Sequence, residues 1–131
     1  MVATLAPKVD VDRFKEDGYL ILEDVLDVEL DLEPVVREYT RLLDDLISKW
    51  HAEGKIPSTY DGLPFGVRLA RFLNDGGPGA YSPFDISLPF AGVSEETPIH
   101  LGPATFALMT SPRLVAAIEQ IVGSEILSNP I

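Results

Sequence analysis

The sequence of 131 residues contains no cysteine, so it can form neither a disulfide nor a thiolate metal site. Basic residues are also scarce, because 10 Lys and Arg stand against 21 Asp and Glu and give a formal charge of −11. Such a field repels phosphate backbones and anionic lipid, which argues against nucleic acid and membrane surfaces as partners. No apolar run has the length of a membrane span, and residues 1–7 lack the pattern of a signal peptide. We therefore expect a cytoplasmic protein.

The hydrophobic fraction of 46% is typical of a globular chain, and the length suits one domain. Proline and glycine are rare before Gly54 and frequent after it. This change in composition predicts a single incomplete domain in three parts. Residues 1–54 would form a strand and a long amphipathic helix, residues 55–110 Pro/Gly-rich loops and short helices, and residues 111–131 a helix that leads into a core strand.

The strongest helix signal runs from residue 35 to residue 50. We expect Asp31 to cap this helix, because Pro34 then falls in the first turn, where its missing N–H costs nothing. Gly54 is placed to end it. A shorter helix is predicted at residues 11–17, closed by Gly18. The apolar face of the long helix is made of residues at helical spacing: Val35, Val36, Tyr39, Leu42, Leu43, Leu46, Ile47 and Trp50.

Two further helices and two strands are expected. Apolar spacing over residues 65–73 indicates one helix, and Ser111 with Pro112 has the N-cap and first-turn pattern of another, which Gly123 would stop. Residues 19–22 and 125–128 have the composition of short strands. Because a strand needs neighbours for its backbone groups, the second one would be the first strand of a sheet.

Few side chains are able to hold a metal or carry out catalysis. His51 and Glu53 with the distant His100 have the ligand types of a non-haem iron site, but residues two apart on a helix point to different sides. The simpler interpretation of His51 is a histidine at a helix C-terminus, and that of His100 a loop histidine bound to a backbone carbonyl. Arg68 and Arg71 would either meet an anionic substrate or pair with nearby acids. No complete catalytic constellation is present.

Two segments carry a family resemblance. Residues 14–26 contain a Phe-x-x-Asp-Gly-Tyr step from a short helix into a strand, followed by an acidic turn, and the long helix comes next. Residues 111–130 have the pattern of a helix that ends at a glycine and leads into a core strand. In this order the two segments resemble the opening of the phytanoyl-CoA dioxygenase family.

The resemblance implies an α+β fold, the mainly helical N-terminal part of a double-stranded β-helix (jelly-roll) oxygenase with few short strands. It also implies Fe(II) held by an H-x-D motif and a later histidine, 2-oxoglutarate as cosubstrate, and hydroxylation of a small organic substrate. None of these ligands falls within the chain, so no catalytic, metal or cofactor-binding residue is predicted. We expect the truncated chain to be inactive alone and to need the missing C-terminal jelly-roll part. The loop from Tyr81 to Pro103 would contribute Tyr81 and His100 to the substrate entrance, and Asn129 would join them there. The alternative is a non-enzymatic helical binding or interaction module.

Overall fold

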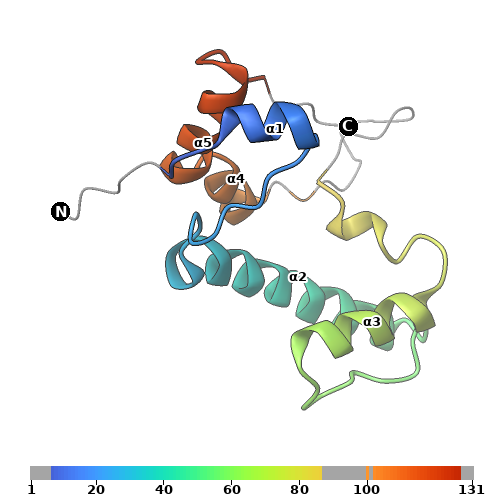
Figure 1. Cartoon of the computed structure of the whole chain (residues 1–131). Helices are drawn as coiled ribbons and strands as arrows, with labels where there is room; N and C mark the ends of the chain where they lie inside the picture. The colour runs from blue at the N-terminus through green and yellow to red at the C-terminus, as the bar shows by residue number, and fades with distance from the viewer. Residues whose placement is uncertain (1–6, 87–99, 101, 128–131) are drawn as a thin grey trace. The chain divides into compact units, whose positions relative to one another are not determined.

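The computed structural model describes residues 7–86, 100 and 102–127, and these residues contain helices and no strand (Figure 1). The elements in chain order are α1 (Val11–Asp17), η1 (Val28–Leu32), α2 (Glu33–Ala52), α3 (Phe65–Gly76), η2 (Ser82–Phe84), α4 (Pro103–Met109) and α5 (Pro112–Val122). The chain divides into two compact units: unit 1 comprises residues 1–35 and 103–129, and unit 2 residues 36–102 and 130–131. The predicted single domain stays a prediction.

The expected α+β fold is wrong for the described residues. Residues 19–22 and 125–127 are irregular, and residue 128 lies outside the described residues. Exposure nevertheless alternates in the first segment, since Tyr19 and Ile21 are exposed and Leu20 and Leu22 are half-buried. The side chains follow the period of a strand, but no ladder partner is present in the described part of the chain. Composition alone does not make a strand when its N–H and C=O groups find no neighbour.

Helix α1 has the predicted bounds because both of its ends are capped. The Asp10 carboxylate accepts a hydrogen bond from the Arg13 N–H at 3.0 Å. At the other end Gly18 adopts the left-handed conformation with φ 77°, and its N–H donates to the Phe14 carbonyl. Helix α5 also confirms its prediction, since the Ser111 hydroxyl caps it and Gly123 follows its last residue.

The start of the long helix differs from the expectation. Asp27, not Asp31, is the cap: its carboxylate accepts from the Glu29 and Leu30 N–H groups, both at 2.9 Å. Asp31 instead accepts from the Asp27 N–H at 2.7 Å. The two carboxylates therefore hold the π-helical turn η1 in front of α2, which itself begins at Glu33. Aspartate competes for backbone donors at whichever position the turn presents them.

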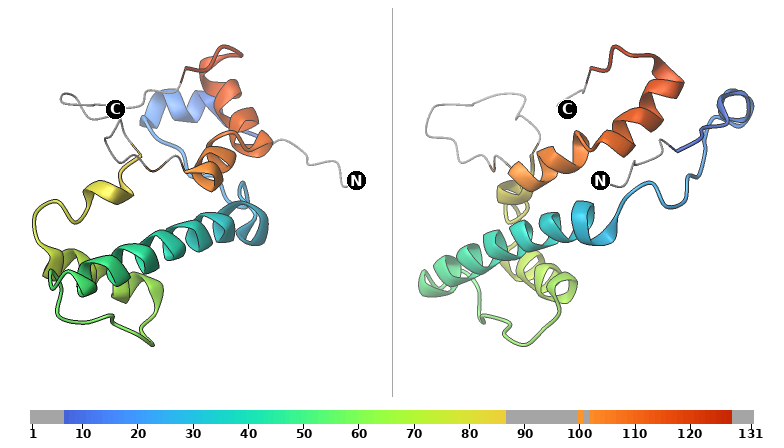
Figure 2. Two further views of the ribbon diagram at one scale, coloured as in Figure 1. Left: turned by 180° about the vertical axis from the view of Figure 1, so that it is seen from behind. Right: turned by 90° about the vertical axis from the view of Figure 1, so that its left-hand side faces the viewer.

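The hydrophobic core of unit 2 lies mainly between α2 and α3, which are next to each other in Figure 2. Leu43, Ile47 and Phe72 are almost completely buried there. The part of the predicted apolar face from Leu42 to Trp50 thus packs on the apolar face of α3, whereas Val36 is exposed. The other buried members of the core follow the two helices in the chain: Ile56, Tyr60, Ala80 and Phe84.

Unit 1 buries much less. Among its described residues only Val9, Ser111 and Ala117 are buried. Gln120 on α5 ties down the chain before α1, because its side-chain amide donates to the Pro7 carbonyl at 2.7 Å and accepts from the Val9 N–H at 3.2 Å. Helix α4 contacts both η1 and α5. Many hydrophobic side chains of unit 1 are half-buried and few are fully buried, so its apolar interior is small.

Candidate functional site

In unit 2, His100 is surrounded by polar and aromatic side chains from the N-terminal half of α2. His100 Nε2 is 2.9 Å from the Glu38 carboxylate, and both side chains are mostly buried, at 16% and 14% exposed. The His100 ring also meets the Tyr39 ring edge-on, with the ring centroids 5.3 Å apart. We call Glu38, Tyr39 and His100 the histidine cluster.

Tyr39 connects the histidine cluster to η2. Its hydroxyl donates a hydrogen bond to the Phe84 carbonyl at 3.2 Å, and its ring stacks on the Phe84 ring. Phe84 in turn lies edge-on to Phe72 in the core, with centroids 5.9 Å apart. Through Tyr39 and Phe84, the histidine cluster contacts the core of unit 2. These contacts fix the orientation of the His100 ring.

The chemistry open to this cluster is limited. A carboxylate that orients a histidine is one half of an acid–base arrangement, and catalysis needs a third group, such as a nucleophile or a metal. Within the described parts of the chain, no group of three His, Asp or Glu side chains is placed to hold a metal ion. The geometry shown is that of a tether, in which His100 binds the chain before α4 to α2.

The predicted entrance residues are not brought together. Tyr81 is 62% exposed and precedes η2, whereas His100 is directed to α2. Asn129 lies outside the described residues. The interpretation of His100 as bound to a backbone carbonyl is wrong, because its partner is the Glu38 carboxylate. Sequence reasoning missed Glu38 and Tyr39, since neither lies in a motif and 62 residues separate Glu38 from His100.

The other histidine and the arginines have structural surroundings. His51 is exposed in the last turn of α2, and the nearby Glu53 pairs with Lys55 at 2.7 Å. That hydrogen bond lowers the pKa of Glu53. Arg68 pairs with Asp44 on α2, which bears out the expectation of a nearby acid.

A second polar contact closes the loop between α2 and α3. The Tyr60 hydroxyl donates to the Asp75 carboxylate at 2.7 Å. Burial, and then the bond to Asp75, raise the pKa of Tyr60 to about 12. The same bond, helped by Asn74, lowers the pKa of Asp75. Tyr60 also has a φ of 54°, a left-handed conformation that is costly for a residue with a side chain. Its buried ring and its hydrogen bond hold it there.

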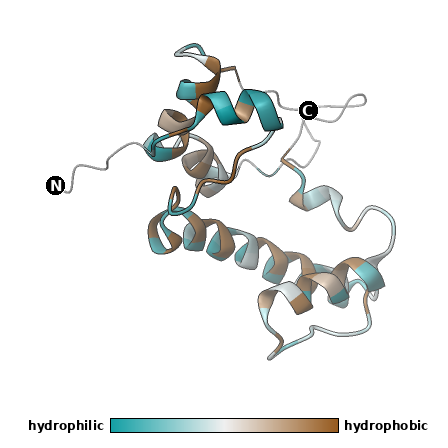
Figure 3. Cartoon of the chain, in the orientation of Figure 1, coloured by the Kyte–Doolittle hydropathy of each residue, from teal (hydrophilic) through white to brown (hydrophobic). Residues whose placement is uncertain are grey.

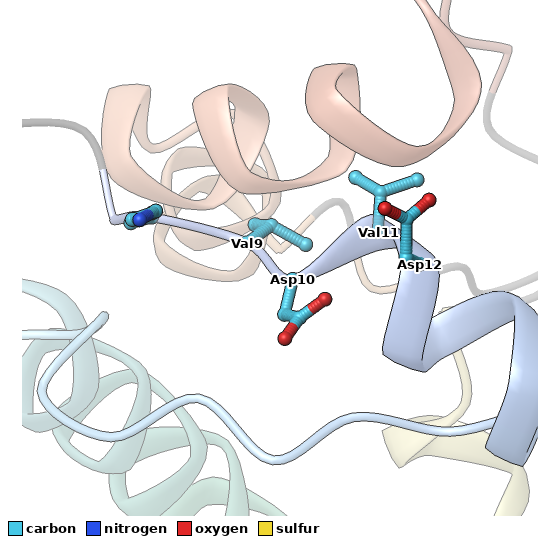
Figure 4. A pocket seen from close by; sticks show the side chains of 5 residues that line it. Val9, Asp10, Val11 and Asp12 are labelled. Atoms are coloured by element: carbon cyan, nitrogen blue, oxygen red, sulfur yellow. The ribbon is translucent and has the colours of Figure 1, made fainter.

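A shallow pocket lies at the start of α1, lined by residues 8–12 (Figure 4). Val9 is buried against the unit, and the Asp10 carboxylate caps the helix. The lining therefore serves the local structure and does not bring together a set of catalytic groups. No helix among the described residues is long and apolar enough to cross a membrane.

Comparisons with known proteins add no assignment to this geometry. No family model matches the chain, and no curated protein or solved structure matches it.

Proposed function

We propose that this chain is the N-terminal helical part of a non-haem Fe(II)/2-oxoglutarate-dependent dioxygenase that hydroxylates a small organic substrate in the cytoplasm. The chain would supply scaffold, and a C-terminal jelly-roll part would supply the iron ligands. The proposal rests on the resemblance of residues 14–26 and 111–130 to the phytanoyl-CoA dioxygenase family. It concerns a helical segment and includes no strand within the described residues.

One structural observation supports the proposal. A short helix, α1, ends at the left-handed Gly18, and an irregular hydrophobic segment and an acidic turn follow before the long helix α2. The two helices and the acidic turn stand in the order of the family's opening, whereas the strand expected between α1 and the turn is absent from the described residues. Helix α5 ending before Gly123 agrees with the second segment.

The residues present do not fit an iron site. Neither histidine is followed by x-Asp, since His51 precedes Ala52-Glu53 and His100 precedes Leu101-Gly102. His100 is bound to Glu38, and His51 lies exposed at the end of α2. We therefore derive no reaction step in this chain, and Fe(II) and 2-oxoglutarate belong in the proposal to the complete protein alone.

The test compares two preparations in the presence of Fe(II) and 2-oxoglutarate. One is the isolated chain of 131 residues, and the other is the natural protein captured from its source with an antibody to this chain. The proposal expects succinate from the natural protein and none from the isolated chain. If the isolated chain formed succinate, the proposal that the iron ligands lie in the C-terminal part would be overturned. If the natural protein formed no succinate, the assignment as an oxygenase would be overturned.

A second candidate function has an observation of its own. Most of the large hydrophobic side chains that are exposed among the described residues belong to unit 1, including Ile21, Leu30 and Phe106. Such a surface favours a helical interaction module that binds another protein. A natural protein that has no oxygenase activity and co-purifies with a stoichiometric partner would support this module over the oxygenase.

A further inference from the structure

Unit 1 has exposed hydrophobic side chains on two elements that are in contact. Val28 and Leu30 on η1 are exposed, as are Phe106 and Met109 on α4. Helix α4 contacts η1, so these side chains belong to neighbouring elements. Figure 3 shows hydrophobic residues on η1 and along the segment between α1 and η1. We call Val28, Leu30, Phe106 and Met109 the unit-1 apolar surface.

The side chains of this surface lie largely in water. Leu30 and Phe106 are 74% and 66% exposed. Burial of one such side chain contributes about 1.5–3 kcal/mol, so leaving several in water forgoes a large stabilisation. Single exposed hydrophobic residues are ordinary, but a group on contacting elements marks an interaction site.

The charge around this apolar surface determines which kind of partner can bind to it. Residues 16–33 include eight acidic and no basic residues, interleaved with the exposed hydrophobic residues of η1 and of the segment before it. Over the whole of unit 1, twelve acidic residues stand against four basic ones. Glu23, Asp24 and Glu29 are exposed, and Glu29 lies on η1 between Val28 and Leu30.

This charge distribution favours one occupant. A second copy of the chain would bring the same excess of acid to the contact, and like charges placed together disfavour binding. Anionic lipid and nucleic acid are disfavoured for the same reason. Lysine and arginine around an apolar centre would complement both features.

We propose that the unit-1 apolar surface binds a partner protein whose contact surface has an apolar centre and a rim of lysine and arginine. The apolar residues supply the affinity, and the acids from Glu23 to Glu29 speed association and select the partner's charge. This inference goes beyond the oxygenase proposal and does not depend on it.

The experiment uses the full chain and three labelled peptides of about 18 residues, a length at which a helix forms readily. The first peptide has a leucine face and a lysine face, the second replaces lysine by glutamate, and the third replaces leucine by serine. Fluorescence anisotropy measures binding at low and at high salt. We expect the leucine–lysine peptide to bind at least tenfold more tightly than the other two, and more weakly as salt screens the charges.

Matched variants locate the binding. Phe106→Ser and Leu30→Ser should each weaken the leucine–lysine peptide at least tenfold, whereas Val67→Ser on α3, at an exposed position of unit 2, should not. For the charge, Glu23→Gln with Glu29→Gln should reduce affinity several-fold at low salt, whereas Asp45→Asn on α2 should leave it unchanged. Circular dichroism confirms that each variant keeps the helix content of the parent chain.

Several results would overturn the inference. If the leucine–glutamate peptide bound as tightly as the leucine–lysine peptide, the argument from charge would be wrong. If Val67→Ser weakened binding as much as Phe106→Ser does, the assignment of the site to unit 1 would be wrong. A dimer in sedimentation that Phe106→Ser dissociates would show that a second copy occupies the surface. Hydrogen exchange that finds α4 already protected in the free monomer would show that another part of the same chain covers it. Oxygenase assays of the natural protein do not bear on any of these outcomes.

Discussion

The contact between Gly76 and Trp50 offers a sharp test of the packing in unit 2. A Cβ added at Gly76 would lie 2.7 Å from the Trp50 Cζ3 atom and 3.0 Å from the Ala80 Cβ. Ordinary contacts of a Cβ begin near 3.4 Å, so the Trp50 ring would have to move. That ring packs on Phe72, with centroids 5.0 Å apart, and the Lys55 ammonium lies 5.4 Å from its centre. Movement of the ring would therefore disturb the core.

The expected magnitude follows from two opposing effects. Alanine in place of a helical glycine contributes about 0.5–1 kcal/mol of stability through chain entropy. Overpacking of a filled interior costs about 1–3 kcal/mol. We therefore expect Gly76→Ala to lower the free energy of unfolding by about 1 kcal/mol, the difference between the middle values of these two effects. Gly66→Ala, in the same helix, meets nothing within 4 Å and should raise it slightly.

Urea unfolding followed by tryptophan fluorescence measures both variants, since Trp50 is the single tryptophan of the chain. The fluorescence emission of the folded Gly76→Ala variant should also shift in wavelength, because Trp50 is both the fluorescent residue and the residue that is displaced. If Gly76→Ala proved as stable as Gly66→Ala, the described packing of α3 on the end of α2 would be refuted.

Three further predictions concern polar contacts. Tyr60 has its pKa raised from 10.0 to about 12, so its bond to Asp75 stabilises the fold fully below about pH 10 and is lost as the pH rises toward 12. Tyr60→Phe should lower the free energy of unfolding at neutral pH by about 1 kcal/mol and flatten the alkaline decline, as measured by urea unfolding at a series of pH values. Ser111→Ala removes the cap of α5 and should lower the free energy of unfolding by about 1 kcal/mol. The helical circular dichroism signal of the variant should then be lost at a lower temperature than that of the parent chain. An unchanged melting curve would contradict this prediction. His100→Ala removes the contact with Glu38 on α2 and should lower the free energy of unfolding by about 1 kcal/mol. His51→Ala, at an exposed position, should change it by less than about 0.5 kcal/mol. Equal effects of the two variants in urea unfolding would contradict the role of His100 as a tether.

Helices α1, α2, α3 and α5 could be predicted because their signals are local. Gly18 and Gly123 follow the last residues of α1 and α5, and the spacing of apolar residues in α2 predicts the face that buries Leu43 and Ile47. Helix α3 runs beyond the predicted residue 73 to Gly76, since glycine at the end of a helix does not break it. Its bounds are therefore less predictable than its existence.

The remaining features depend on contacts that are distant in the sequence. Residues 19–22 have the composition of a strand, but a strand exists only if a neighbour supplies hydrogen bonds, and no local pattern tells whether it does. Helix α4 was not predicted because its residues follow a Pro/Gly-rich stretch and show no cap pattern. The pairing of His100 with Glu38 was equally unpredictable, since each residue has many possible partners at that separation.

The central claim is that this chain serves as the helical scaffold of a larger oxygenase. Intact-mass measurement and peptide sequencing of the natural protein, captured with an antibody to this chain, test it most directly. The claim predicts a polypeptide heavier than 14.3 kDa whose sequence contains an H-x-D motif and a later histidine beyond the segment described here. A natural protein of 14.3 kDa, or a longer one without that motif, would contradict it.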